Sequence, residues 1–275
     1  MTVIQDPDLA DVLGGGCDDD IKLLIDVITD GGKGRVSLSS SVCDALNKAK
    51  DGNLGLYERA LVAEELSRFG GNSLMNLLRR GSGVPYKELL CDVASHVEVS
   101  MASMTDCAEI EMAIIAKMVE RSLNDMSEEE KATFFASVGG SYTTGMGPAA
   151  MAMLLASLAS SRASSYGLAA MVASATMKSI VGRGVAFAGG ATLGRGLAVL
   201  AGPLGWAITG IWTAFDLASP AYRVTVPCVI QIGYMRQKML LQDACPRCHT
   251  KVGPGSKFCG NCGEQLTKAL PRALS

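Results

Sequence analysis

Apolar positions recur at helical spacing through the first half of the chain. In the segment YERALVAEELSRF, Leu61, Val62, Leu66 and Phe69 fall on one face of a helix. The same pattern predicts helices over residues 21–29, 57–69, 73–80, 86–99, 107–123 and 131–138. We therefore expect the first 138 residues to form a helical domain.

Start and stop signals accompany this pattern. Gly31-Gly32 ends the first of these helices, and Thr105 or Asp106 can begin the one at 107–123. Ser127 and Glu130 have the spacing of a capping box. These signals place the helix limits within a few residues.

Charge is scarce in the middle of the chain. No acidic residue lies between Lys131 and Asp216, and residues 132–161 and 196–215 carry no charge at all. The second run is long enough to cross a bilayer, although Gly202-Pro203 would kink it. Three interpretations stay open: a helical hairpin layer buried against the N-terminal domain, a segment that inserts into a membrane on activation, and a permanent anchor.

Small residues recur at every fourth position in GRGVAFAGGATLGRGLAVLAG, where they would let helices approach closely. This packing seam consists of Gly182, Ala186, Gly190, Gly194, Ala198 and Gly202. Glycine costs a helix about 1 kcal/mol relative to alanine, so we expect close packing as the compensating gain. Further along, Pro227 predicts a turn followed by a helix over about residues 229–242.

Four of the nine cysteines form two CxxC pairs near the C-terminus. In CPRCHTKVGPGSKFCGNCG, the ten residues between the pairs include a Gly/Pro/Ser-rich connector that lets the second turn fold back onto the first. Four thiolates complete the closed site of a structural zinc ion, which leaves no open position for a substrate. The predicted zinc ligands are Cys245, Cys248, Cys259 and Cys262.

Composition sets the fold class. Apolar residues make up 48% of the 275 and aromatic residues only 5%, which favours helices over sheets. The predicted fold is all-α: a helical domain over 1–138, a Gly/Ala-rich apolar helical region with hairpins over 139–242, and a small zinc ribbon over 243–275. The first residues lack the basic and apolar regions of a secretory signal, so we expect a reducing cytoplasm without disulfides.

The two ends of the chain differ in charge. Up to Asp30 there are eight acidic residues and one basic residue, whereas from Cys245 onward there are five basic residues and one acidic residue. Arg247, Lys251 and Lys257 of the ribbon can contact RNA phosphates or an acidic protein surface. The alternative is that the ribbon only staples a module too small for its own core.

One helix face could carry acid/base chemistry. Glu88, Asp92 and His96 are four residues apart and share a face, and Arg79 and Arg80 just upstream could hold a phosphate. The alternative is a solvated face opposite an apolar stripe. Neither a P-loop nor a GxSxG, HExxH or dinucleotide-binding motif occurs in the sequence.

The strings EELSRFGGNSLMNLLRRG, YKELLCDVASHVEV and SPAYRVTVPCVIQIGYMRQ resemble the YaaW-like family of bacterial proteins, over about residues 6–241. The resemblance implies a helical region like that of the ubiquinol–cytochrome c chaperone domain, as a fold-level analogy. It carries over no catalytic residues. Short family members lack the zinc ribbon, which is an addition in this chain.

A module that can recognise a partner, joined to a region that can assemble or insert, predicts a conditionally activated effector of bacterial stress or phage defence. Such an antiviral protein would oligomerise and act toxically at the membrane. One alternative is a partner-activated ribonuclease toxin that uses the Glu88/Asp92/His96 face, and a second is an assembly chaperone. Whether the chain is an enzyme therefore stays open.

The expected partners follow from these hypotheses. They are further copies of the chain, a protein trigger or client, RNA, and an anionic membrane. We expect a cytoplasmic protein that associates with the inner membrane on activation.

Overall fold

The protein is built from α-helices. The computed structural model describes residues 4–35, 37–70, 83–102, 104–137, 140–159, 162–182, 221–245, 247–248, 250–253 and 256–266. Within these ranges there is no strand, only the isolated antiparallel bridges Ala244–Lys251 and Phe258–Gln265. The predicted all-α class is confirmed for this part of the chain.

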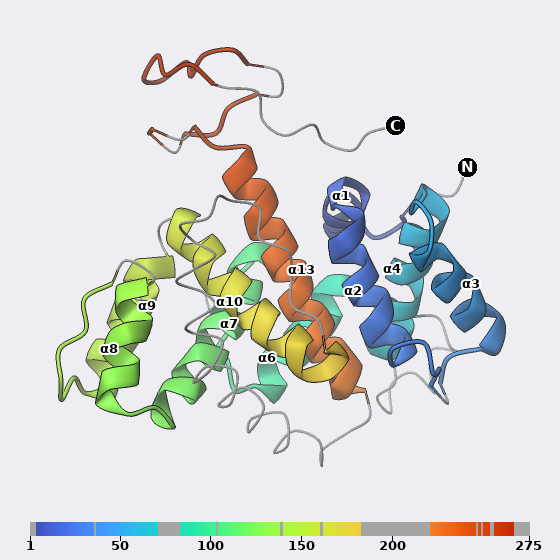
Figure 1. The fold of residues 1–275 in the computed structure, drawn as a ribbon, viewed down its shortest axis with the longest axis horizontal. Coiled ribbons are helices and arrows are strands. Elements are labelled where there is room, and N and C mark those ends of the chain that lie inside the picture. The colour runs from blue at the N-terminus through green and yellow to red at the C-terminus, as the bar shows by residue number, and fades with distance from the viewer. Residues whose placement is uncertain are drawn as a thin grey trace.

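Figure 1 shows the helices gathered around α13, with the C-terminal segment projecting beyond its end. The N-terminal part contributes α1 (Pro7–Gly15), α2 (Asp18–Thr29), α3 (Ser40–Lys50), α4 (Leu56–Gly70), α6 (Tyr86–His96) and α7 (Cys107–Asn124). The remaining described helices are α8 (Glu128–Ser137), α9 (Pro148–Ala159), α10 (Arg162–Val181) and α13 (Tyr222–Gln242).

Capping residues begin and end several helices where the sequence predicts. The Asp106 side chain accepts a hydrogen bond from the N–H of Ala108 at the start of α7. Glu130 N donates to Ser127 Oγ (3.3 Å) and Ser127 N donates to Glu130 Oε2 (2.8 Å), so the capping box of α8 is confirmed. Helix α2 ends at its C-cap residue Asp30, which has a left-handed φ of 54°, and Gly31 follows with a φ of 66°.

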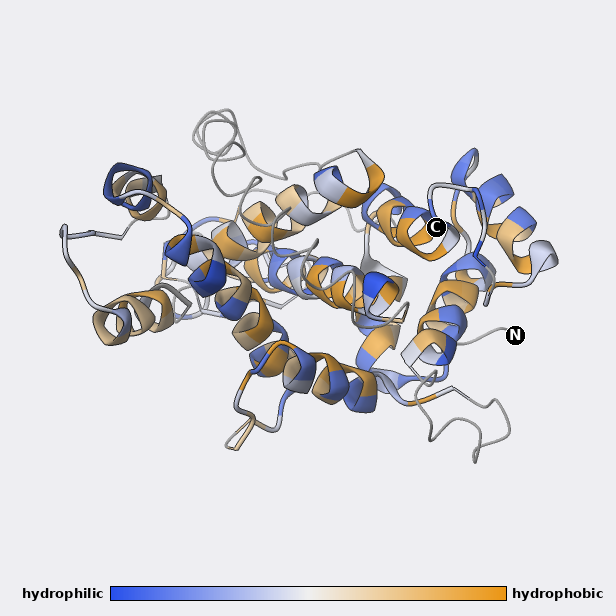
Figure 2. Ribbon diagram, turned by 90° about the horizontal axis from the view of Figure 1, so that it is seen from below, coloured by the Kyte–Doolittle hydropathy of each residue, from blue (hydrophilic) through white to orange (hydrophobic). Residues whose placement is uncertain are grey.

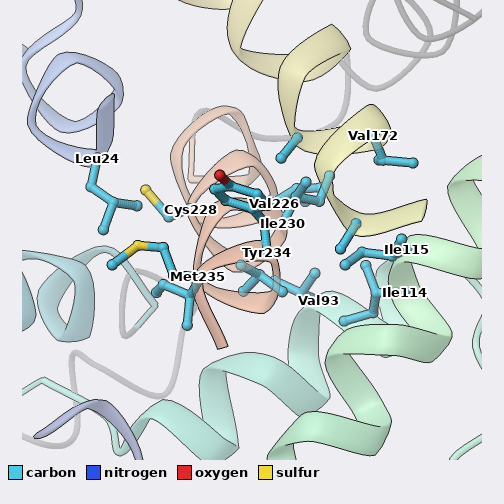
Figure 3. Packing of buried hydrophobic residues seen from close by; sticks show 14 of the residues in the cluster. Leu24, Val93, Ile114, Ile115, Val172, Val226, Cys228, Ile230, Tyr234 and Met235 are labelled. Atoms are coloured by element: carbon cyan, nitrogen blue, oxygen red, sulfur yellow. The ribbon is translucent and has the colours of Figure 1, made fainter. Parts of the chain in front are cut away.

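Helix α13 lies at the centre of the hydrophobic core. It packs against α10, α7, α2, α4 and α6, and Val226, Ile230 and Tyr234 on it are fully buried. Figure 3 shows these side chains between Leu24 of α2 and Ile115 of α7. Helices that cover a core carry apolar residues toward it and polar residues toward solvent. In Figure 2 most of the helices carry both kinds of residue.

The structure corrects the predicted start of this central helix. The sequence predicts a turn and then a helix from about residue 229, but α13 begins at Tyr222 and continues through Pro227. A proline inside a helix costs about 3 kcal/mol. Val224 and Val226 are fully buried, and each contributes about 1.5–3 kcal/mol, so tertiary packing outweighs the local signal.

Among the described residues of the Gly/Ala-rich middle, α10 is largely buried and α9 is partly exposed. In α10, residues 168–173 are all buried, and the helix packs against α13 and α7. In α9, by contrast, Ala152 and Ala156 are exposed and Met153 is 75% exposed. Helix α10 therefore fits the interpretation of a layer buried against the N-terminal helices.

Among the described helices, none combines the length and the apolar character that crossing a membrane requires. The uncharged run at 196–215 lies outside the described residues. Of the packing seam, Gly182 follows α10 with a φ of 73°. The other seam positions lie outside the described residues: Ala186, Gly190, Gly194, Ala198 and Gly202.

Candidate metal centre and adjoining cleft

The two CxxC pairs, Cys245/Cys248 and Cys259/Cys262, lie in turns whose thiols face each other. In each turn the N–H of the first cysteine donates to the carbonyl five residues later, at 2.9 and 2.8 Å. Gly263 has a φ of 74°, in the left-handed region that favours glycine, and its N–H donates to Cys259 O (2.9 Å). The glycine after the second pair therefore shapes that turn.

The four thiols meet at one point. Their Sγ atoms all lie within 4.8 Å of one another. The Cys245–Cys262 and Cys248–Cys259 Sγ atoms are 3.6 and 3.5 Å apart. A tetrahedral zinc ion with Zn–S bonds of about 2.3 Å places its sulfur atoms about 3.8 Å apart. The arrangement therefore fits one structural zinc ion, as the sequence predicts.

Hydrogen bonds prepare one of these thiols for a metal. Side-chain and backbone hydrogen bonds from Thr250, followed by one from Asn261, lower the pKa of Cys248 to about 5. Zinc binds the thiolate and not the thiol. These hydrogen bonds therefore favour the form of Cys248 that a metal binds.

The ribbon continues directly from α13. Asp243 is the C-cap residue of this helix, and its carbonyl accepts a hydrogen bond from Val252 N (2.8 Å). Ala244 forms the antiparallel bridge with Lys251. These contacts hold the first CxxC turn against the end of α13.

A cleft of about 670 Å³ opens where the ribbon meets the helical body. It lies between the end of α13, helix α1, the first residues of α4 and α7, and the ribbon. Figure 1 shows α1 beside the upper end of α13. Arg236 and Leu240 line it from α13, Asp11 from α1 and Lys251 from the ribbon. Its volume is typical of ligand-binding sites.

Arg236 of the cleft wall forms an ion pair with the buried Glu111. Arg236 Nε donates to Glu111 Oε2 (2.8 Å) and Nη2 to Glu111 Oε1 (3.1 Å), while Nη2 also donates to Asp8 O (2.9 Å). The Tyr86 hydroxyl donates to Glu111 Oε1 (2.8 Å). Burial raises the pKa of Glu111, which Arg236 and Tyr86 only partly offset. The pair connects α1, α6, α7 and α13.

A glycine allows this contact. A Cβ atom on Gly233 would lie 3.1 Å from Ile115 Cδ1 and 3.2 Å from Glu111 Cβ. Helix α13 therefore approaches α7 closely at Gly233. Arg236, nearly one turn later, reaches Glu111 because of that approach.

Comparisons with known proteins identify the family. The family model described as ubiquinol-cytochrome C chaperone matches residues 59–230, and a zinc-ribbon domain model matches residues 245–266. The chain belongs to the ubiquinol-cytochrome C chaperone family. The sequence resemblance to YaaW-like proteins and the zinc ribbon are therefore both confirmed.

Curated relatives cover most of the chain. A UPF0174 protein of Helicobacter pylori (strain J99) is 36% identical over 220 residues, which are 80% of this chain and 87% of the relative. The UPF0174 protein YaaW of Escherichia coli (strain K12) is 29% identical over 217 residues, 77% of this chain and 86% of YaaW. No solved structure matches the chain.

The basic residues predicted to bind RNA or phosphate lie in different environments. Arg247 is exposed and pairs with Glu264 (3.4 Å). Lys257 is also exposed, whereas Lys251 lines the cleft. Arg79 and Arg80 lie outside the described residues. Binding of RNA or phosphate by these five residues stays a prediction.

The predicted acid/base face lies within the family's helical region, on α6. Asp92 is exposed, while Glu88 and His96 are half-buried. The His96 ring stacks on Tyr222 of α13, with centroids 3.7 Å apart and planes 8° from parallel. Burial and then the nearby Arg121 charge lower the pKa of His96. The ring thus takes part in the α6–α13 contact, and a catalytic role stays a hypothesis.

The Glu111–Arg236 pair is a feature that the sequence patterns above do not predict. A signal exists for one partner: Glu111, Ile115 and Met118 share a helix face, and all three are fully buried. A carboxylate at an apolar position predicts a buried partner. Its identity could not be predicted, because Arg236 is 125 residues away in the sequence.

Proposed function

We propose that the protein is an assembly chaperone, which binds a client polypeptide between its helical body and its zinc ribbon. The observation that carries the proposal is the cleft at the junction of these two parts. The family model described as a chaperone matches residues 59–230 of the helical body and ends before the ribbon. The ribbon would then add a recognition surface to a family scaffold.

A closed four-thiolate site supports a binding role for the ribbon. Its ligand positions are all taken by cysteine, so zinc there shapes a surface and has no open position for a reactant. Lys251 of this surface lines the cleft. A zinc-shaped surface beside a cleft is a suitable arrangement for holding a polypeptide.

The test is induced expression of the tagged full chain in an Escherichia coli strain that lacks its YaaW relative. We expect intact RNA, an unchanged membrane potential and a stable complex with a small set of cross-linked proteins. A client among them should aggregate when expressed alone and become soluble when this chain is co-expressed. Clients that are equally soluble with and without the chain would refute the chaperone function.

A conditionally activated, oligomerising effector is the second candidate. It is favoured by the stretch without acidic residues between Lys131 and Asp216 and by the exposed small and apolar face of α9, which includes Met153. In this case the same culture would lose membrane potential on induction. Degraded RNA would instead point to the ribonuclease alternative.

The seam offers a specific variant for the effector function. A leucine at Gly190 would prevent close helix approach, so Gly190→Leu should abolish oligomers and any toxicity. The matched variant Gly190→Ala keeps a small side chain and should retain both. Wild-type assembly and toxicity in Gly190→Leu would show that the seam is not an interface. Size-exclusion chromatography and culture density measure the two effects.

A further inference from the structure

The cleft between the ribbon and the helical body exposes apolar side chains. Leu56 is 64% exposed and Leu240 is 36% exposed, and both line it. The described part of the chain has few exposed large hydrophobic residues: Leu56, Tyr57, Met153, Leu240 and Phe258. Apolar side chains concentrated in a cleft are typical of a binding site.

Small residues keep the cleft open on the α1 side. A Cβ atom on Gly14 would meet no atom within 4 Å, so the space beside this residue is empty. A Cβ atom on Gly15 would lie 3.2 Å from Met239 Cε, which shows how closely α1 approaches α13 there. Gly14, Gly15 and Met239 thus line the α1 floor of the cleft, with room for an incoming side chain beside Gly14.

The charged residues that line the cleft indicate which kind of ligand it would bind. Three carboxylates line the cleft, from Asp11, Asp106 and Asp243. The lining cations are Arg236 and Lys251, but the charge of Arg236 is balanced by the buried Glu111 carboxylate. The cleft therefore carries an excess of negative charge, and a ligand that complements it brings positive charge together with apolar groups.

We propose that this cleft binds a client segment in which leucine-like side chains alternate with lysine or arginine. The proposal rests on the chaperone function and names its substrate class. The apolar side chains would contact Leu56, Leu240 and the α1 floor, while the cationic groups lie near the three carboxylates. Lys251 repels the cationic groups of such a ligand, so this ribbon residue lowers the affinity of the cleft for it.

The direct test uses fluorescein-labelled twelve-residue peptides and the purified zinc-loaded full chain. Fluorescence anisotropy should show that a Leu/Lys peptide binds at least about tenfold more tightly than a Leu/Glu or a Ser/Lys peptide. Equal binding of the Leu/Lys and Ser/Lys peptides would refute the apolar part of the proposal. Equal binding of Leu/Lys and Leu/Glu would refute the electrostatic part.

Two charge reversals on opposite sides of the cleft should act in opposite directions. Asp11→Lys should weaken Leu/Lys binding by about threefold to tenfold, and Lys251→Glu should strengthen it by a similar factor. Asp44→Lys is the matched control, because Asp44 is an exposed helical acid on α3 that does not line the cleft. Equal weakening by Asp11→Lys and Asp44→Lys would mean that the peptide responds only to net charge and would overturn the proposal.

A separate variant tests the apolar contact made by Leu240. Leu240→Ser should weaken Leu/Lys binding at least about fivefold, since it removes a leucine from the cleft. Met153→Ser on α9 changes an exposed apolar residue elsewhere and should leave binding unchanged. Unchanged binding in Leu240→Ser, with circular dichroism equal to wild type in both variants, would refute the assigned site.

Client capture in cells separates failure of the cleft from failure of the chaperone function. If clients still depend on the chain but Asp11→Lys and Leu240→Ser bind them normally, the chaperone function stands and the cleft is not its site. If the peptides bind as proposed but no protein depends on the chain for solubility, the cleft stands and the chaperone function falls.

Discussion

Cys259→Ser will abolish zinc binding and unfold the ribbon while leaving the helical body folded. Structural zinc sites contribute about 10–16 kcal/mol of apparent binding free energy in small peptides, so a module of this size depends on its metal. The expected result is a loss of one zinc ion per chain. Metal analysis of freshly purified protein measures it, and far-ultraviolet circular dichroism reports on the helices.

The control for this variant is Cys91→Ser. Cys91 lies on α6, is half-buried and is remote in sequence from the four thiols. It should keep its zinc. A Cys259→Ser protein that still carries one zinc ion per chain would show that the four thiols are not the ligands.

Zinc loss should also change the cleft. Lys251 is held over it by the bridge to Ala244, within a turn that the metal closes. When the ribbon unfolds, one wall of the cleft is lost. Client binding that needs the ribbon should therefore weaken when the metal is removed by a chelator.

Arg236→Met will lower the free energy of unfolding by about 3–5 kcal/mol, because it leaves a charged carboxylate buried without its partner. The Glu111 side chain is fully buried and receives hydrogen bonds from both Arg236 and Tyr86. The melting temperature should fall by about 10 °C. Thermal unfolding followed by circular dichroism measures the change.

Two comparisons make this prediction specific. Lys117→Met breaks the partly exposed surface pair with Glu120 and should cost less than about 1 kcal/mol. The double variant Glu111→Leu with Arg236→Met removes both charges and should recover most of the stability lost by Arg236→Met alone. If Arg236→Met costs no more than Lys117→Met, the buried pair does not stabilise the body.

The pH dependence of Arg236→Met provides a further check. Burial raises the pKa of Glu111 in the folded protein, and without Arg236 that effect is unopposed by a cation. A carboxyl whose folded-state pKa is raised contributes stability below its unfolded pKa and loses it as the pH rises through the folded value. The difference in stability between wild type and Arg236→Met should therefore shrink as the pH falls toward the ordinary pKa of a glutamate side chain.

Local sequence determined the helices and the metal site. The capping box of Ser127 and Glu130 and the glycines after α2 act within a few residues, so no tertiary information is needed to recognise them. The CxxC pairs are equally local, since each turn aims two thiols at one point. The helical class, several helix limits and the four zinc ligands could therefore be predicted from sequence.

Tertiary structure decided which residues of these helices form a site. The early start of α13, the Glu111–Arg236 pair and the cleft all arise from contacts between segments far apart in the sequence. Helical periodicity indicates that a face is buried, but not which helix covers it. In the sequence, Gly233 predicts only a weak helix position. The packed structure shows that it lets α13 approach α7 closely enough for Arg236 to reach Glu111.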